Sequence, residues 1–265
     1  MKNYMIKSLG VLLLAVALAA CGSSPTPTAP PVDLPAPVVT AAVPTAQPNL
    51  CNNIYYPVKN KAVYKYTSTG SSAGAYSFQN VISRSTRKGF TVTSRFKKAV
   101  NRLRWECKPE GLAAMGIGLT DMASSMALRQ FTNFTASNVT GVSLPANLAP
   151  GMEWAYAFDL QGTERVKPGE PAGNIAGRIS MNYKAGNIGN VTVPAGSFDA
   201  LAIEVKTSTE FQIVRANGQN QQIVSFATYT IWYAPGVGLI KSNGSGNLNS
   251  QKYFETIVLD SYTIP

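Results

Sequence analysis

Residues 50–265 alternate apolar and polar side chains with a period of two, in short runs that glycine, asparagine and proline interrupt. In residues 201–206 the larger apolar side chains fall on one face, whereas Glu204 and Lys206 fall on the other. Successive side chains of a strand point to opposite faces, so such runs are typical of half-buried strands. We therefore expect a mainly β fold, with a single antiparallel, strongly curved sheet or open β-barrel and one short helical or loop insertion.

Turn sequences predict where strands end. Residues 193–196, Val-Pro-Ala-Gly, have proline and glycine at the second and fourth turn positions. Asn217-Gly218 and Asn243-Gly244 fit two-residue hairpin loops. We expect a hairpin at each of the three places.

The segment from Gly111 to Arg129 departs from the strand pattern. Gly116 and Gly118 disfavour a stable helix there. The segment is expected to be a helix or loop packed on the sheet, or else a lid over an apolar pocket, since methionine-rich surfaces adapt to varied partners. Five apolar residues are spaced three and four apart, as on one face of a helix: Leu112, Met115, Leu119, Met122 and Met126.

The N-terminus has the parts of a secretory signal. Lys2 and Lys7 give it a positive start, an apolar stretch runs from Leu9 to Leu18, and two alanines follow. The apolar stretch is roughly half as long as a bilayer core requires. Residues 1–20 are therefore expected to be a signal peptide and not a membrane span.

Leu18-Ala19-Ala20-Cys21 resembles the lipobox of bacterial lipoproteins. In that family the signal is cleaved just before the cysteine, whose thiol carries acyl chains such as palmitate. The resemblance implies a lipid on Cys21, a membrane partner and a cell-envelope location. Gly22 resembles the pattern that is sorted to the outer membrane in bacteria with two membranes. The alternative is an ordinary secreted protein with a chance cysteine.

Residues 21–49 are expected to be the lipidated cysteine and a tether rich in proline, threonine and alanine. A single charge, Asp33, stands among them. Such a segment cannot pack a core and extends on the order of 80 Å as a semi-rigid spacer. Residues 50–265 then form the head. A short repeat, RLRWECKPEGL (102–112) and YTIWYAPGVGL (229–239), suggests two related halves at about 50–130 and 150–265, with chance similarity as the alternative.

The chain has three cysteines. With Cys21 acylated, Cys51 and Cys107 remain in an oxidising compartment, where one disulfide is the simplest outcome. Zinc is a poor alternative, because two thiols in a chain without histidine leave a tetrahedral site short of ligands. We expect the disulfide and no metal.

Three segments of the head, VPAGSFDALAIEV (193–205), WYAPGVGLIKS (232–242) and LPANLAPGMEW (144–154), resemble recurring motifs of a large family of uncharacterised bacterial envelope proteins. The resemblance implies an antiparallel sheet curled into an open barrel, similar in outline to the lipoprotein carriers of bacterial envelopes. It brings no catalytic residues with it. Gly236 and Gly238 are suited to tight turns, and Trp232 and Phe198 are expected to be core residues.

Little in the sequence indicates catalysis. The absence of histidine excludes Ser-His-Asp triads, Cys-His dyads and histidine-based metal sites. Ser94 and Lys97 match an S-x-x-K motif, but residues three apart on a strand face opposite sides. A two-carboxylate glycosidase stays open, since its residues need meet only in space. We expect no enzymatic activity, no catalytic residues and no cofactor.

Basic residues outnumber acidic ones. The 23 basic and 13 acidic residues give a formal charge of +10, and loss of Lys2 and Lys7 with the signal lowers it to +8. The basic segment is either a solvated strand face that prevents aggregation or a contact with an anionic surface, such as lipid headgroups, glycolipid phosphates or acidic wall polymer. Nucleic acid is not expected for a lipid-anchored envelope protein. Cations gather in one segment: Arg84, Arg87, Lys88, Arg95, Lys97, Lys98, Arg102, Arg104 and Lys108.

Two hypotheses for function follow. In the first, the head binds or carries a lipid or other amphiphile in the concave side of an open barrel, with the methionine-rich segment as lid and the basic segment as headgroup contact. In the second, the head has a structural or assembly role and docks onto an anionic envelope polymer or a protein complex. An exposed apolar cavity would favour carriage, whereas a filled core with an outer patch would favour docking.

Overall fold

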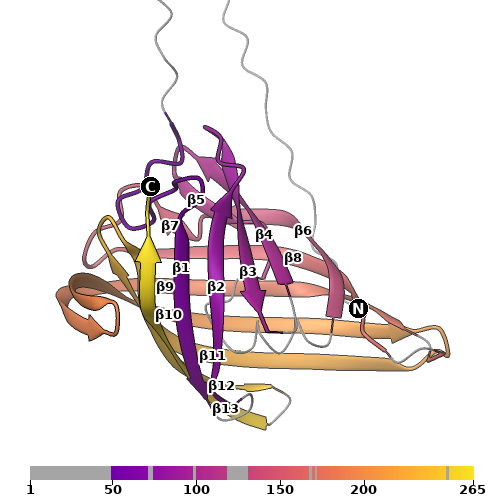
Figure 1. Ribbon diagram of the computed structural model, residues 1–265. Helices are drawn as coiled ribbons and strands as arrows, with labels where there is room; N and C mark the ends of the chain where they lie inside the picture. The colour runs from indigo at the N-terminus through magenta and orange to yellow at the C-terminus, as the bar shows by residue number, and fades with distance from the viewer. Residues whose placement is uncertain are drawn as a thin grey trace, which may run out of the picture. The chain divides into compact units, whose positions relative to one another are not determined.

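The computed structural model describes residues 49–70, 74–97, 100–117, 131–166, 169–170, 172–248 and 251–265, all within one compact unit, Ala46–Pro265. In these residues thirteen strands form one sheet, and every neighbouring pair is antiparallel (Figure 1). The expected single antiparallel, curved sheet is confirmed. The strands are β1 (Val63–Gly70), β2 (Tyr76–Ser83), β3 (Gly89–Phe96), β4 (Val100–Lys108), β5 (Gly111–Ala114), β6 (Phe131–Gly141), β7 (Leu144–Pro145), β8 (Glu153–Glu164), β9 (Gly173–Val193), β10 (Gly196–Arg215), β11 (Asn220–Ala234), β12 (Gly238–Leu248) and β13 (Gln251–Thr263).

The sheet consists of two meanders joined side by side. Strands β1 to β5 pair in sequence order, and so do strands β8 to β13. The last strand, β13, pairs with the first, β1, so the yellow and indigo ends of the chain lie together in Figure 1. The ladder between β13 and β1 therefore makes one continuous sheet from the two meanders.

The edges of this sheet approach each other at one end. β6 pairs with β8 at one edge and β7 pairs with β5 at the other, yet only Val142 and Ser143 separate β6 from β7 along the chain. The amide of Ser143 donates a hydrogen bond to the carbonyl of Leu112 (2.8 Å), and the hydroxyl of Tyr156 in β8 donates to the carbonyl of Ala114 in β5. These contacts curl the sheet into a half-barrel.

The concave side of the sheet holds the core. Apolar side chains alternate along each strand toward this side, and they form two clusters. The larger cluster joins β1–β4 to the facing parts of β10–β13. The smaller one lies along β8 to β11 and includes Phe158, Leu160, Ile179 and Phe211. Phe198 and Trp232, expected to be core residues, are only half-buried at the border of the larger cluster, and the Lys241 ammonium lies 5.2 Å from the centroid of the Trp232 ring.

Two of the three expected hairpin turns are confirmed. Residues 193–196 connect β9 to β10, and Asn217-Gly218 lies between β10 and β11. The third is wrong, because Asn243-Gly244 lies inside β12. Gly244 is there for a packing reason, since the side chain of Tyr229 on the neighbouring strand occupies the place of a Cβ.

The helix expected in the segment from Gly111 to Arg129 is wrong for the first four residues. Residues 111–114 form β5, which pairs with β4 and β7. Their side chains are all buried because the two sheet edges converge around them. Residues 118–130 lie outside the described part of the chain, and with them Leu119, Met122 and Met126.

The expected disulfide is confirmed. Cys51 and Cys107 are bonded, with their Cα atoms 5.0 Å apart. The expected signal peptide, Cys21 and the tether up to residue 48 lie outside the described residues. Within the described residues there is no helix of the length and apolarity that a membrane crossing needs.

Candidate functional site

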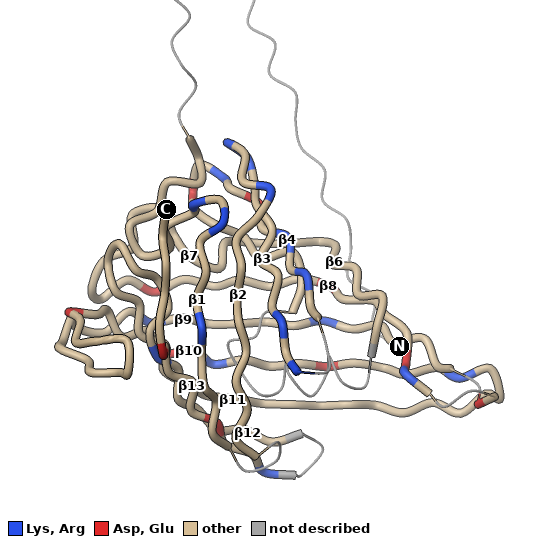
Figure 2. Tube along the Cα trace, in the orientation of Figure 1, with Lys and Arg blue, Asp and Glu red and all other residues tan. Residues whose placement is uncertain are grey.

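Four exposed cations share the convex face of the N-terminal meander, opposite the core. Lys65 in β1 and Arg95 in β3 lie directly opposite Gln79 of β2 from its two sides. Arg102 and Arg104 in β4 lie opposite threonines of β3 on the same face. All four side chains are exposed, and Figure 2 shows lysine and arginine positions in blue along β1, β3 and β4. We call Lys65, Arg95, Arg102 and Arg104 the basic face.

Most of the other cations that the sequence singled out lie apart from this face; Lys108, half-buried at the end of β4 on the same side as Arg104, is the exception. Arg84, Arg87 and Lys88 are exposed in the turn between β2 and β3, at one end of the sheet. Lys97 is exposed just after β3. Lys98 lies outside the described residues. Strand pairing therefore splits the basic segment into a turn group and a face group.

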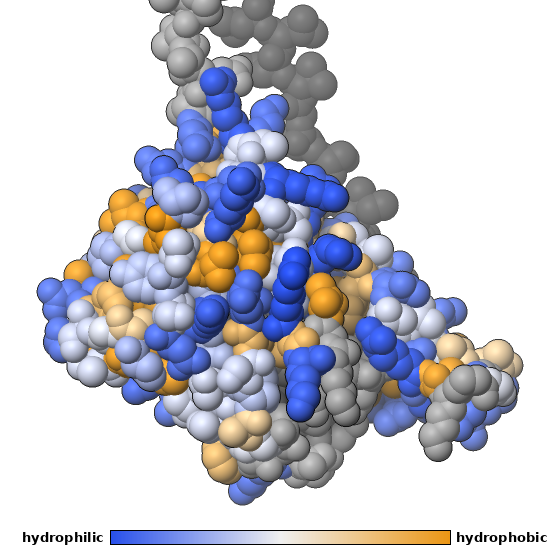
Figure 3. Space-filling model, in the orientation of Figure 1, coloured by the Kyte–Doolittle hydropathy of each residue, from blue (hydrophilic) through white to orange (hydrophobic). Residues whose placement is uncertain are grey.

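The basic face carries little compensating negative charge. Arg104 forms an exposed ion pair with Glu106 at 3.1 Å. Asp260 at the border of the face accepts a hydrogen bond from Thr67 (2.6 Å). The remaining cations of the basic face make no ion pair with any described residue. Figure 3 shows hydrophilic side chains spread over this side of the molecule, beside apolar ones.

The apolar residues proposed as a lid are only partly described. Leu112 is fully buried in β5, directly opposite Leu144 of β7. Met115 is half-buried just after β5. Both residues belong to the place where the sheet edges converge, so their position is that of packing side chains.

The concave side also holds polar groups. Within the described residues, one buried side chain is charged, that of Glu255 in β13. Its Oε1 accepts hydrogen bonds from the hydroxyls of Ser68 in β1 and Tyr76 in β2, both at 2.5 Å. Other buried polar residues of the inner faces are Ser94, Thr209, Ser225 and Ser242.

Two tyrosines packed in the larger cluster, half-buried Tyr56 and buried Tyr66, are held in the neutral form. Burial raises the pKa of Tyr56 and that of Tyr66 well above the usual value. The hydroxyl of Tyr66 donates a hydrogen bond to the carbonyl of Leu239 at 3.0 Å. These side chains therefore act as hydrogen-bond donors and aromatic surface, and not as anions.

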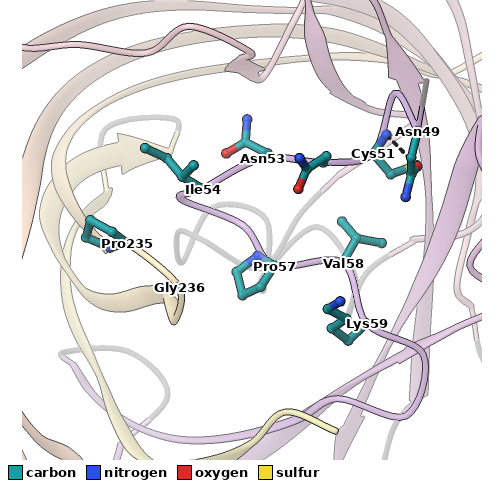
Figure 4. Close-up of a pocket in the computed structure, with 10 residues that line it drawn as sticks. Asn49, Cys51, Asn53, Ile54, Pro57, Val58, Lys59, Pro235 and Gly236 are labelled. Carbon is teal, nitrogen blue, oxygen red and sulfur yellow. Dashed lines mark hydrogen bonds between the residues drawn. The ribbon is translucent and has the colours of Figure 1, made fainter.

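A pocket of about 560 Å³ opens at the end of the half-barrel that carries the disulfide. Its walls are the loop of residues 49–59 and the turn between β11 and β12 (Figure 4). Ile54, Pro57 and Pro235 give it apolar surface, and the amide of Gly236 donates a hydrogen bond to the carbonyl of Ile54 (2.7 Å). The WYAPGVG motif thus forms a turn that fastens the N-terminal loop over the end of the sheet.

The structure does not bring Ser94 and Lys97 of the S-x-x-K motif together. Ser94 is buried on the concave side, whereas Lys97 is exposed after the strand ends. In the described part of the chain no cluster of three or more carboxylate, thiol or imidazole groups could hold a metal ion.

Sequence reasoning missed Lys65 and the contacts of Glu255. Lys65 stands alone in its strand, 19 residues before the first cation of the basic segment, Arg84. Ser68 and Glu255 are 187 positions apart. No local pattern relates them, because the pairing of β13 with β1 brings them together.

The arrangement can be compared with known proteins. A search of curated proteins finds no match. A protein from Bacteroides fragilis, described as exported and with a YmcC-like fold, is 13% identical over 80% of this chain and 100% of its own, with a TM-score of 0.48. A protein from Parabacteroides distasonis, described as a lipoprotein, is 12% identical over 80% of this chain and 99% of its own, with a TM-score of 0.43. A family model matches residues 97–253, more than half of the chain, which therefore belongs to the DUF3108-like family.

Proposed function

We propose that this chain is a non-enzymatic, lipid-anchored protein of the bacterial cell envelope whose head docks onto anionic lipid headgroups. One observation carries the proposal: four exposed cations lie on one convex face with a single ion pair among them. The exposed basic patch on the outer side of the sheet supports docking. The outer membrane is the proposed location in a host with two membranes, because Gly22 follows Cys21.

The energetics of such docking suit a tethered protein. A cation close to an anionic membrane contributes roughly 1 kcal/mol, and guanidinium groups can form paired hydrogen bonds with phosphate oxygens. An acyl anchor combined with a basic patch gives firmer membrane attachment than either gives alone. The tether would keep the basic face at high local concentration near the same membrane.

The test uses the chain from Gly22 onward, which contains every described strand but no lipid. Its binding to phosphatidylcholine vesicles, with and without phosphatidylglycerol, is measured by co-sedimentation. The triple variant Arg95→Gln, Arg102→Gln and Arg104→Gln should lower the partition coefficient on anionic vesicles by about a hundredfold, at roughly 1 kcal/mol per cation.

The matched control removes three cations that already have partners. Arg178, Lys184 and Lys206 are ion-paired with Asp159, Glu153 and Glu204. Their triple Gln variant has the same net charge as the first and should keep most of the binding. Equal loss in both variants would mean that only net charge matters. If the wild type bound acidic wall polymer and did not bind vesicles, the docking partner would be a polymer and not a lipid.

A second candidate function is binding of an amphiphile on the concave side. The observation that favours it is the polar group of Glu255, Ser68 and Tyr76 beside the apolar clusters. A purely structural core gains nothing from a buried carboxylate, whereas a binding site uses one to orient a ligand.

A further inference from the structure

Glu255 is anomalous for a residue in a core. Its side chain is on the concave side of β13, and only 6% of the residue is exposed. Oε2 has no hydrogen-bond partner among the described residues, and no lysine or arginine of that part of the chain forms an ion pair with this carboxylate. Buried carboxylates are normally paired and fully hydrogen-bonded, so this one calls for a physical explanation.

The existing hydrogen bonds leave one oxygen for a further partner. The hydroxyls of Ser68 and Tyr76 both donate to Oε1, at 2.5 Å. Two donors on the same oxygen fix the orientation of the carboxyl group and suit its ionised form, which accepts and does not donate. The carboxylate is thus positioned by the protein on one side and unsatisfied on the other.

The neighbours of Glu255 favour a compact cation as that partner. The residues directly opposite it on the two adjacent strands are glycines, Gly70 in β1 and Gly244 in β12, which bring no side chain beside the carboxylate. Tyr253 precedes it on the same face, and Tyr229 lies opposite Gly244. A carboxylate among aromatic residues is a setting in which ammonium groups bind well.

We propose that Oε2 of Glu255 binds the primary ammonium group of an amphiphile whose chain lies against the apolar concave side. A guanidinium group fits less well, because it uses both oxygens of a carboxylate. A divalent metal would need several more oxygen ligands. The inference deepens the second candidate function and rests on it.

The probe is decylammonium below its micelle concentration, with decanol as the uncharged partner of equal chain length. A cationic probe is repelled by the basic face, so its binding cannot arise from docking there. Calorimetry with the chain from Gly22 onward should give about tenfold or more tighter binding of decylammonium than of decanol, as expected for a hydrogen bond to a charged group. In Glu255→Gln this preference should disappear.

A second measurement keeps the inference testable if the variant alters packing. Without probe, Glu255→Gln should raise the Tm by about 2–4 °C, because it removes an uncompensated buried charge while keeping an oxygen that can accept from Ser68 and Tyr76. Equal binding of both probes by wild type and variant would overturn the ammonium site but keep amphiphile binding. No saturable binding of either probe would overturn both.

Discussion

Two aromatic residues of the sheet lie directly opposite glycines of neighbouring strands. Tyr229 pairs with Gly244 in β12 and Phe211 pairs with Gly177 in β9, and a Cβ at either glycine would overlap the neighbouring residue. The two glycines thereby let the neighbouring strand and its aromatic residue approach closely, where a larger residue would force them apart.

Gly244→Ala should therefore destabilise the protein by about 1–3 kcal/mol, as overpacked core sites do. The measurement is the urea midpoint of unfolding. Gly189→Ala is the matched control, because a Cβ at Gly189 in β9 meets nothing within 4 Å. Similar midpoints for the two variants would contradict the packing role of Gly244.

A second residue-scale contact closes the end of the long strands. Arg215 in β10 donates hydrogen bonds to both carboxylate oxygens of Glu164 in β8, at 2.6 and 2.8 Å. Gly173 of β9 lies directly opposite Arg215, and its amide donates to the same carboxylate (3.3 Å). The hydrogen bonds from Arg215 lower the pKa of Glu164 below its usual value.

The lowered pKa of Glu164 makes the stability of the folded protein depend on pH. A carboxyl group with a lower pKa in the folded state stabilises the protein above its unfolded-state pKa, and this stabilisation is lost as pH falls through the folded-state value. Glu164→Gln should thus be less stable than wild type at neutral pH, and the difference should vanish in acid. Urea titrations across this range test it, and a constant difference would refute it.

At the scale of elements, the loop of residues 49–61 closes one end of the half-barrel. The disulfide fastens it to the end of β4. Buried Asn53 donates a hydrogen bond from Nδ2 to the carbonyl of Pro145 in β7 (3.0 Å), and its Oδ1 accepts from the amide of Tyr55 (2.9 Å). The ring of Tyr56 stacks on Trp105 with centroids 5.3 Å apart. The loop is therefore a structural part of the head.

Replacing Cys51 and Cys107 by serine should lower the free energy of unfolding by about 2–5 kcal/mol, because the cross-link restricts the unfolded chain over a separation of 56 residues. Thermal denaturation with and without reductant measures this. Reductant should lower the Tm of the wild type and leave that of the double serine variant unchanged. No effect on the wild type would contradict the contribution of the disulfide.

At the scale of the whole molecule, the ladder between β13 and β1 holds the two meanders together. Tyr66 of β1 lies opposite Leu259 of β13, which is fully buried. On the convex side of the same strand Phe254 is 59% exposed. One strand thus supplies both core and surface.

Leu259→Asp should cost about 4 kcal/mol or more, because it places a charge in the core where the two meanders join. Phe254→Asp introduces the same charge on the same strand at the surface and should change stability little. Circular dichroism of both purified variants distinguishes them. A folded Leu259→Asp variant with an unchanged Tm would contradict the contribution of this ladder to stability.

Local patterns predicted the elements better than their arrangement. The alternation in residues 201–206 correctly placed Leu201 on the buried side and Glu204 on the exposed side of β10. The helical reading of Leu112 failed, because β5 is buried at all four positions between the converging edges and so shows no strand alternation in sequence. The hairpin expected at Asn243-Gly244 failed because a glycine required by close packing against the neighbouring strand looks the same in sequence as a turn glycine.

The sequence by itself determined that the head is an antiparallel β structure and that Cys51 and Cys107 pair, since alternation, turn residues and cysteine number act locally or by count. Only the tertiary structure decided that Lys65 joins Arg95, Arg102 and Arg104 on one face, and that Ser68 and Tyr76 meet Glu255. The physical reason is that strand register is set by packing between segments far apart in the chain, and a one-residue shift would turn each side chain to the other face.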